Sequence, residues 1–297
     1  LKGDFSSYGS GSEFINVHHP YTHDLDIFGE GSLFQYLNRG HTRGAKKLLA
    51  ARLSLTSGNQ ADILLRQEAV KELAAKTDFR HEVQALSMQI DEQPDDERQL
   101  NQWLEQPSFI YGRLPYRFLL VILPFITVTL VVAAFFMEGI TTFAVLAAGL
   151  QWVFLGFHMK RVNAFHQYIS RKKNMLEKYA RILYYIRKDE YGSRLMQTLG
   201  AQAREADEKV RHLASLVSAL DARMNMLTNL AVNSLLLYDL QCVYRLEKWK
   251  EENAAHLAKW LETIRETEVL SSMGTFAFNH ASFAFPVITP DRKLSAR

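Results

Sequence analysis

Five basic residues on one predicted helix form the clearest cluster of side chains that could do chemistry. Lys160 and Arg161 come first, and Arg171, Lys172 and Lys173 follow about three turns later. Such cations bind DNA phosphates and anionic lipid head groups by the same electrostatics, without reading a sequence. A solvated helix face that binds nothing is a third interpretation. Because a long apolar segment ends just before Lys160, the position favours lipid head groups over DNA.

Three histidines near the N-terminus, His18, His19 and His23, lie beside Asp24 and Asp26 and could contribute to a metal site. Zinc sites on helices take their histidines from a defined spacing, such as i and i+4 on one face. No recognisable helix holds these histidines at that spacing. Loop and packing roles are therefore favoured, and we predict no metal site in this chain.

Motifs that mark common active sites do not occur in the sequence. The chain contains no G-x-x-x-x-G-K-[ST] loop, no G-x-G-x-x-G, no H-E-x-x-H, no C-x-x-C and no G-x-S-x-G. The turn at residues 29–32 could cradle a phosphate, but the start of a helix explains it better. The single cysteine, Cys242, excludes an internal disulfide framework and fits a reducing compartment. We predict that this chain has no catalytic residues and binds no cofactor of its own.

Two uncharged apolar runs, residues 118–137 and 139–157, interrupt an otherwise polar chain. Each is close to the roughly 20 residues that a helix needs to cross a hydrocarbon core of about 30 Å. Only Glu138 separates them, which predicts a tight transmembrane hairpin. Small residues on the second run, including Ala144 and Gly149, would let the helices approach closely. The alternative is an unusually apolar hairpin that is buried in a helical protein core.

Basic residues flank both outer ends of this hairpin, while its tip has none. Arg113 and Arg117 precede it, and Lys160 and Arg161 follow it. Because Lys and Arg are enriched in cytoplasmic loops, this distribution predicts that both soluble arms are cytoplasmic. The expected location is the inner, or cytoplasmic, membrane.

Apolar side chains that recur every three to four residues predict helices through most of the remaining chain. The longest stripe runs from Val210 to Ala231, in a region with no proline and, after Gly200, no glycine. It predicts one helix of about 45 residues, nearly 70 Å long, followed by a second at 253–270. No β alternation is sustained before residue 275. The predicted fold class is all-α: an elongated helical core with long lever helices and the apolar hairpin.

These elements divide the chain into five predicted segments. They are an irregular lead-in (1–30), a first group of core helices (31–115), the apolar hairpin (116–159), lever helices that return to the core (160–273) and a connector (274–297). The formal charge of +3 over 297 residues is nearly balanced and does not by itself predict nucleic-acid binding.

Two separated stretches resemble the core region of the MutS family of DNA mismatch-repair ATPases. The first is GSLFQYLNRGHTRGAKKLLAARL at 31–53, continued by ILLRQEAV at 63–70. It is similar to the family's G-S-L, its T-x-T-x-x-G turn, its R-L-L and its I-x-x-R-Q-x-A-V. The second is EVLSSMG at 268–274, followed by Phe283 and Phe285-Pro286. It resembles D-V-L-x-S-L-A followed by an aromatic residue and a proline, and the order and spacing agree with the family.

Several positions depart from the family pattern. Gly40 replaces the first threonine of the turn, Ala45 stands where its glycine is expected, and Arg52 replaces a tryptophan. The apolar hairpin falls within the lever and clamp region, where soluble members have none. The mismatch-reading motif of the family's N-terminal domain does not occur here.

The resemblance implies the core and lever region of a divergent, membrane-anchored MutS-like branch. The family's ATPase domain, with its ATP and Mg²⁺, would begin just after Arg297, and this chain would link it to a DNA- or membrane-contacting region. The implied partners are double-stranded DNA, a lipid bilayer through residues 118–157, and a second copy of the chain, although no heptad seam supports a homodimer. The alternative is a membrane scaffold that keeps the core shape without binding DNA. A channel or transporter is disfavoured because neither apolar run contains a charged residue.

Overall fold

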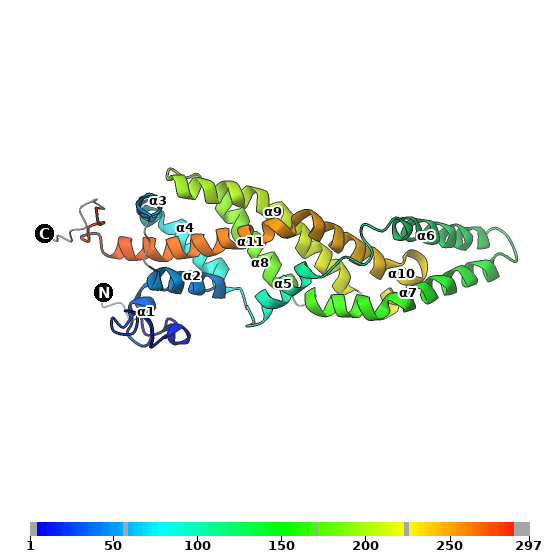
Figure 1. Ribbon diagram of the computed structural model, residues 1–297. Helices are drawn as coiled ribbons and strands as arrows, with labels where there is room; N and C mark the ends of the chain where they lie inside the picture. Colours follow the sequence, from blue (N-terminus) through cyan, green and yellow to red (C-terminus); the bar gives the residue numbers. More distant parts are fainter. Residues whose placement is uncertain (1–4, 56–58, 170–171, 223–225, 288–297) are drawn as a thin grey trace. The chain divides into compact units, whose positions relative to one another are not determined.

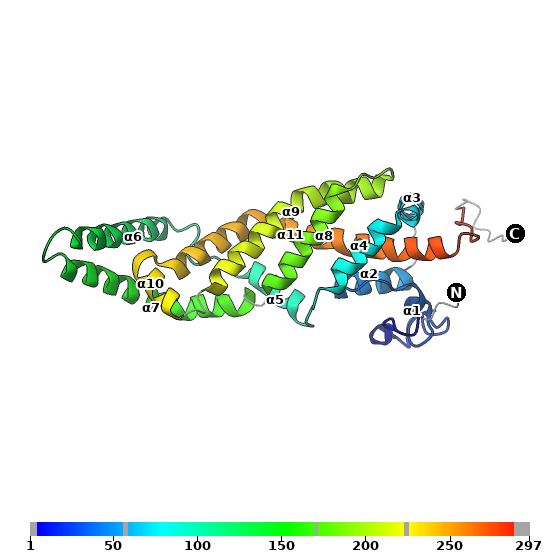
Figure 2. The same cartoon turned by 180° about the vertical axis from the view of Figure 1, so that it is seen from behind.

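The computed structural model describes residues 5–55, 59–169, 172–222 and 226–287 (Figures 1 and 2). Over these residues the structure is all-helical, with eleven α-helices and one short 3₁₀ helix, η1 (Ser12–Phe14). The helices, in chain order, are α1 (Leu33–Leu37), α2 (Arg43–Ser54), α3 (Gln60–Ala75), α4 (Thr77–Met88), α5 (Asp96–Glu105), α6 (Leu114–Ala134), α7 (Thr141–Ile169), α8 (Lys173–Lys188), α9 (Arg194–Asp221), α10 (Met226–Leu236) and α11 (Tyr238–Asn279). No described residue lies in a β-strand, which confirms the all-α prediction.

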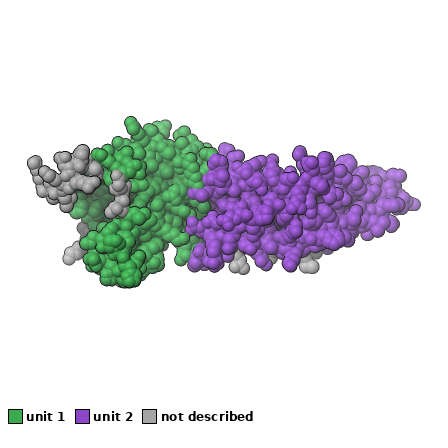
Figure 3. All heavy atoms as spheres, viewed as in Figure 1, with its two compact units in different colours: residues 1–92, 178–207, 259–297 green, residues 93–177, 208–258 purple. Residues whose placement is uncertain are grey.

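The chain divides into two compact units (Figure 3). Unit 1 contains residues 1–92, 178–207 and 259–297, and unit 2 contains residues 93–177 and 208–258. Both units are therefore discontinuous in sequence. Helices α8, α9 and α11 each contribute residues to both.

Unit 1 contains an apolar core that joins the first helices to α11. Its buried members come from the N-terminal loop, from α1 and α2, and from α11: Ile27, Phe28, Phe34, Ala45, Leu49, Ala50 and Val269. Polar caps fix the ends of the helices around this core. Ser32 Oγ accepts from Gln35 N at the start of α1, and Asn59 Oδ1 accepts from Ala61 N at the start of α3. Both caps are residues that favour helix N-termini.

A glycine on α11 allows close packing elsewhere in unit 1. A Cβ on Gly274 would lie 3.1 Å from Leu73 Cβ, 3.2 Å from Ala74 N and 3.2 Å from Arg80 Cδ. The backbone of α11 therefore approaches the end of α3 and the start of α4 so closely that a larger residue would require its neighbours to shift.

Unit 2 is organised around the helical hairpin of α6 and α7. The two helices pack against each other, α10 packs against both, and α5 packs against α7. Helix α7 continues past the apolar run as far as Ile169, and α8 begins at Lys173.

The predicted helix of about 45 residues is wrong. The chain forms α9 up to Asp221, then the separate helix α10, and then α11, whose 42 residues include the helix predicted at 253–270. The break before α11 lies at Leu237, which adopts a left-handed conformation with φ 48°. Side chains stabilise this break, because Asn233 Oδ1 accepts from Asp239 N at 2.9 Å and Tyr238 Oη donates to Ala219 O at 2.8 Å.

Candidate functional site

The two stretches that resemble one family meet in unit 1, at a contact between the start of α2 and α11. Glu268 of α11 is buried, and its Oε1 accepts from His41 N at 3.0 Å and from Thr42 N at 3.4 Å. Thr42 Oγ1 donates to Glu268 Oε2 and also caps α2 by accepting from Ala45 N at 3.1 Å. The carboxyl group thus lies at the N-terminus of α2, where the helix dipole favours negative charge.

Burial is the largest influence on the ionisation of Glu268 and raises the pKa of its carboxyl group. The hydrogen bonds from Thr42 and His41 act in the opposite direction without overcoming the loss of hydration. Burial also lowers the pKa of the neighbouring His41.

Further contacts join the same two stretches on either side of Glu268. Arg39 N donates to Ser272 Oγ at 3.2 Å, and Arg52 forms an ion pair with Glu266. The Arg52–Glu266 pair joins the end of α2 to α11. Near the end of the described chain, Gln67 Nε2 of α3 donates to Pro286 O at 2.9 Å.

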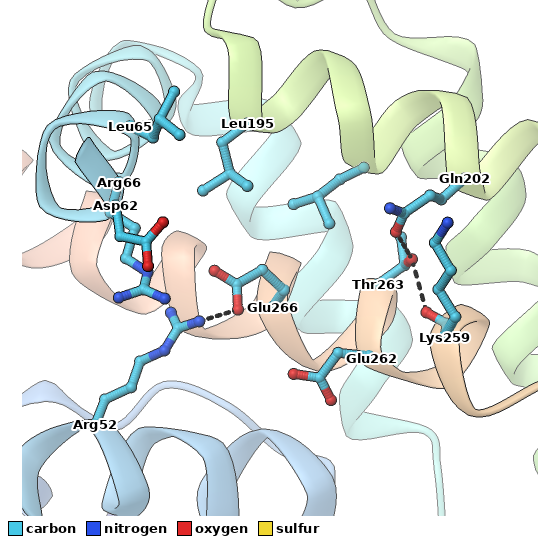
Figure 4. A pocket seen from close by; sticks show the side chains of 11 residues that line it. Arg52, Asp62, Leu65, Arg66, Leu195, Gln202, Lys259, Glu262, Thr263 and Glu266 are labelled. Carbon is cyan, nitrogen blue, oxygen red and sulfur yellow. Dashed lines mark hydrogen bonds and ion pairs between the residues drawn. The ribbon is translucent and has the colours of Figure 1, made fainter. Parts of the chain in front are cut away.

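A pocket of about 310 Å³ lies beside the Arg52–Glu266 pair, between α2, α3, α9 and α11 (Figure 4). Arg52 reaches up from α2 toward Glu266, and the guanidinium of Arg66 on α3 lies next to that of Arg52. Three cations and three carboxylates line the pocket: Arg52, Arg66, Lys259, Asp62, Glu262 and Glu266. Because these charges balance, the pocket has no net charge that would select an anion.

A second, largely apolar cavity of about 410 Å³ shares Arg52 and Arg66 with the first pocket. Its walls come from α3, from the end of α11 and from residues 281–286. Phe283, Phe285 and Pro286, which end the second family-like stretch, are among its lining residues. Both stretches therefore contribute to one joint, in which polar contacts lie beside apolar cavity walls.

The hairpin helices of unit 2 are long and apolar enough to cross a membrane, and their surface is largely exposed. Only 17% of the most apolar window of α6 and 22% of that of α7 is buried. The exposed large side chains include Phe118, Val121, Phe125, Val132, Phe143, Leu146, Leu150 and Phe157. A hairpin in the core of a water-soluble protein would be covered by other parts of the protein, so this exposure favours the membrane interpretation.

A polar contact lies in the middle of the hairpin, which the sequence analysis did not identify. Gln151 Nε2 of α7 donates to Thr127 Oγ1 at 2.6 Å and to Leu123 O at 3.0 Å, both on α6. Both side chains are buried. Such hydrogen bonds hold transmembrane helices together. The sequence feature that could have predicted this contact is Gln151, a polar residue within the uncharged run 139–157.

The small residues of α7 are only partly placed as predicted. Ala144 is buried, whereas a Cβ on Gly149 would meet nothing within 4 Å. At the arm side of the hairpin, Tyr116 Oη and His158 Nε2 form a hydrogen bond of 2.9 Å between α6 and α7.

The predicted basic cluster does not form one surface. Lys160 and Arg161 are exposed near the arm side of the hairpin, and the Arg161 guanidinium lies 5.6 Å from the centre of the Phe109 ring. Lys172 is buried and forms an ion pair with Asp96, so the prediction that it contacts phosphates or head groups is wrong. Lys173 is half-buried, and Arg171 lies outside the described residues.

The N-terminal histidines point to separate partners. His19 Nε2 bonds to Ser54 O at 3.0 Å, and His23 lies against Asp24. Within the described ranges, no three His, Cys, Asp or Glu side chains come together as a metal site.

Comparisons with protein-family models, with curated proteins and with solved structures find no match to this chain.

Proposed function

We propose that this chain is the core and lever region of a membrane-anchored, MutS-like DNA-binding ATPase. In this proposal it couples the nucleotide state of an ATPase domain that follows it to a region that contacts DNA or the membrane. ATP and Mg²⁺ belong to that domain, and this chain itself is not catalytic.

One observation carries the proposal: the two family-like stretches, far apart in sequence, bond to each other through Glu268. A chance resemblance in either stretch would not require the two to meet. The buried bonds from His41 and Thr42, and the flanking Arg52–Glu266 pair, support a joint that holds one relative position of α2 and α11.

A second buried glutamate on α11 supports a mechanical role. In unit 2, Glu247 accepts from the backbone N–H groups of Phe109, Ile110 and Tyr111 at 2.8–2.9 Å. These residues lie just before α6. Each unit thus contains a buried carboxylate of α11 that binds a loop, the loop before α2 in unit 1 and the loop before the hairpin in unit 2.

The membrane anchor is the hairpin of α6 and α7, with Arg113, Arg117, Lys160 and Arg161 at the cytoplasmic side. The exposed Lys160 and Arg161 are positioned to contact anionic lipid head groups, each contributing about 1 kcal/mol near a charged surface.

Alkaline carbonate extraction of membranes tests the anchor. The full-length gene product should stay in the membrane pellet, while a variant that lacks the hairpin, residues 116–159, should be released. Release of both proteins would overturn the anchor.

Duplex-DNA binding tests the other half of the proposal. Binding that depends on phosphate contacts should lose about 10³–10⁵ in affinity between 50 and 200 mM salt if 6–10 phosphates are neutralised.

The gene should also encode a P-loop after Arg297. Membrane retention without DNA binding would instead support a membrane scaffold, which the exposed hairpin surface also fits.

A further inference from the structure

Helix α10 lies in the long helical region that the sequence analysis assigned to a soluble lever, but its composition resembles the hairpin. The stretch from Met224 to Tyr238 contains no Asp, Glu, Lys, Arg or His. The helix itself has 11 residues, which corresponds to about 16 Å. That length is half of a hydrocarbon core of about 30 Å, so α10 is too short to cross a bilayer.

Contacts within unit 2 place α10 at the level of the apolar part of the hairpin. It packs against both α6 and α7, and it lies beside them in both views (Figures 1 and 2). Trp152 Nε1 of α7 donates to Ser234 Oγ of α10 at 2.8 Å. Trp152 precedes the first charged residue of α7, Lys160, by about 12 Å of helix. If the hairpin spans a bilayer, Ser234 lies beside its hydrocarbon region.

Over the part of α10 whose side chains the structure describes, residues 230–236, the exposed side chains are apolar. Leu230 is 55% exposed and Leu236 is 41% exposed. Polar groups at the break have partners: the buried Asn233 accepts from Asp239 N, and Gln241 Nε2 of α11 donates to Leu236 O at 2.7 Å at the exposed edge of the break. Non-helical backbone is tolerated at membrane depth only where the protein covers it and satisfies its polar groups. Leu237, at the break, is fully buried.

The end of α9 lies beside the part of α7 that follows the apolar run. Asp221, at the end of α9, lies 3.2 Å from His166 Nε2, and His166 follows Lys160 on α7. The chain therefore leaves the side of the soluble arms, forms α10 beside apolar α6 and α7, and turns back into α11.

We propose that α10 is a re-entrant membrane helix whose outer face, with Leu230 and Leu236, contacts the acyl chains of the leaflet next to the soluble arms. The inference rests on the proposed membrane anchor and adds to it a third membrane-embedded element. It also places the start of α11 within the leaflet next to the soluble arms, so a movement of α11 would act on the surrounding lipid.

Fluorescent labelling at single positions tests this placement. The environment-sensitive probe NBD is attached to one introduced cysteine in each variant. Leu230→Cys places it on α10, and Phe125→Cys places it on α6 at a residue that is 71% exposed. Glu208→Cys places it at an exposed position of α9. The parent chain is the blank, because its one cysteine, Cys242, is buried. Each protein is reconstituted into phosphatidylcholine–phosphatidylglycerol vesicles with or without nitroxide-labelled acyl chains.

We expect the probes at positions 230 and 125 to show blue-shifted emission and to be quenched by nitroxide lipids. The probe at position 208 should show neither effect. Quenching at 125 without quenching at 230 would place α10 outside the bilayer and overturn this inference, while leaving the anchor intact. Absence of quenching at both positions would remove the anchor together with the inference.

Discussion

Replacing Glu268 by alanine should destabilise unit 1 more than any other single change at the joint. The side chain is buried and accepts from His41 N, Thr42 N and Thr42 Oγ1. A hydrogen bond to a charged group contributes about 1.5–3 kcal/mol, and these bonds are not additive because they share one carboxyl group. Glu268→Ala leaves three buried donors without their acceptor at about 1–3 kcal/mol each, which gives about 3–5 kcal/mol in total because the losses are not additive.

The Glu268→Gln variant should lose much less, about 1 kcal/mol. Because burial raises the pKa of Glu268, the charged carboxylate is less favourable in the folded protein than in water. A neutral side chain of the same shape avoids that cost and keeps one acceptor oxygen. The comparison of alanine with glutamine therefore separates the packing and hydrogen bonds from the charge.

The glutamine variant also gives a pH test with a defined sign. A folded-state pKa above the unfolded value means that the folded protein binds more protons, so its stability falls as pH rises above the ordinary glutamate pKa, 4.5. Glu268→Gln lacks this titration. The stability of the native protein relative to Glu268→Gln should therefore decrease as pH rises from 4.5 through the raised pKa.

Thermal unfolding of the detergent-solubilised chain, followed by circular dichroism, measures these effects. For a unit of this size, 1 kcal/mol shifts Tm by about 2–4 °C, so Glu268→Ala should lower Tm by about 6–20 °C. Glu262→Ala is the matched control, since Glu262 lies on the same helix with a 49% exposed side chain and should change stability by less than about 0.5 kcal/mol. A loss below about 1 kcal/mol in Glu268→Ala, or an equal loss in both variants, would refute the assigned role of the joint.

Three other predictions concern packing, the buried ion pair and the hairpin. Gly274→Leu should cost about 1–3 kcal/mol by overpacking against α3 and α4, whereas Gly192→Leu, where a Cβ would meet nothing within 4 Å, should be nearly neutral in the same thermal assay. Lys172→Met should cost about 3–5 kcal/mol because it leaves Asp96 buried and unpaired, while Lys160→Met should leave Tm unchanged and weaken flotation with anionic vesicles; the reverse pattern would contradict our assignment of these lysines. Gln151→Leu should weaken the hairpin by about 0.5–2 kcal/mol in an SDS-unfolding titration, and an unchanged midpoint would show that the bond to Thr127 contributes nothing.

Local sequence signals predicted the parts of this fold that depend on local physics. Two uncharged runs of membrane length identified α6 and α7, since few soluble helices avoid charge for so long. The starts of α1 and α3 also depend on local physics, because the side chains of Ser32 and Asn59 accept from free N–H groups in the first turn of each helix.

The errors arose where distant residues decide the local structure. No proline or glycine marks the break at Leu237, because Asn233 and Tyr238 stabilise its left-handed backbone through tertiary hydrogen bonds. Lys172 stands between two other basic residues and was therefore assigned to a surface, but its partner Asp96 is 76 positions earlier in the chain. The bond between Thr42 and Glu268 joins residues 226 positions apart, so no local pattern predicts that they meet.

The discontinuity of unit 1 sets an order of events during synthesis. Thr42 must wait for 226 further residues before Glu268 exists, which takes about 10–45 s at 5–20 residues per second. During that interval the ribosome delivers α6 and α7, which are apolar enough to enter a bilayer as they emerge. Val269 of α11 completes the apolar core around Phe34 and Leu49, so the core of unit 1 is finished only after α6 and α7 have been made.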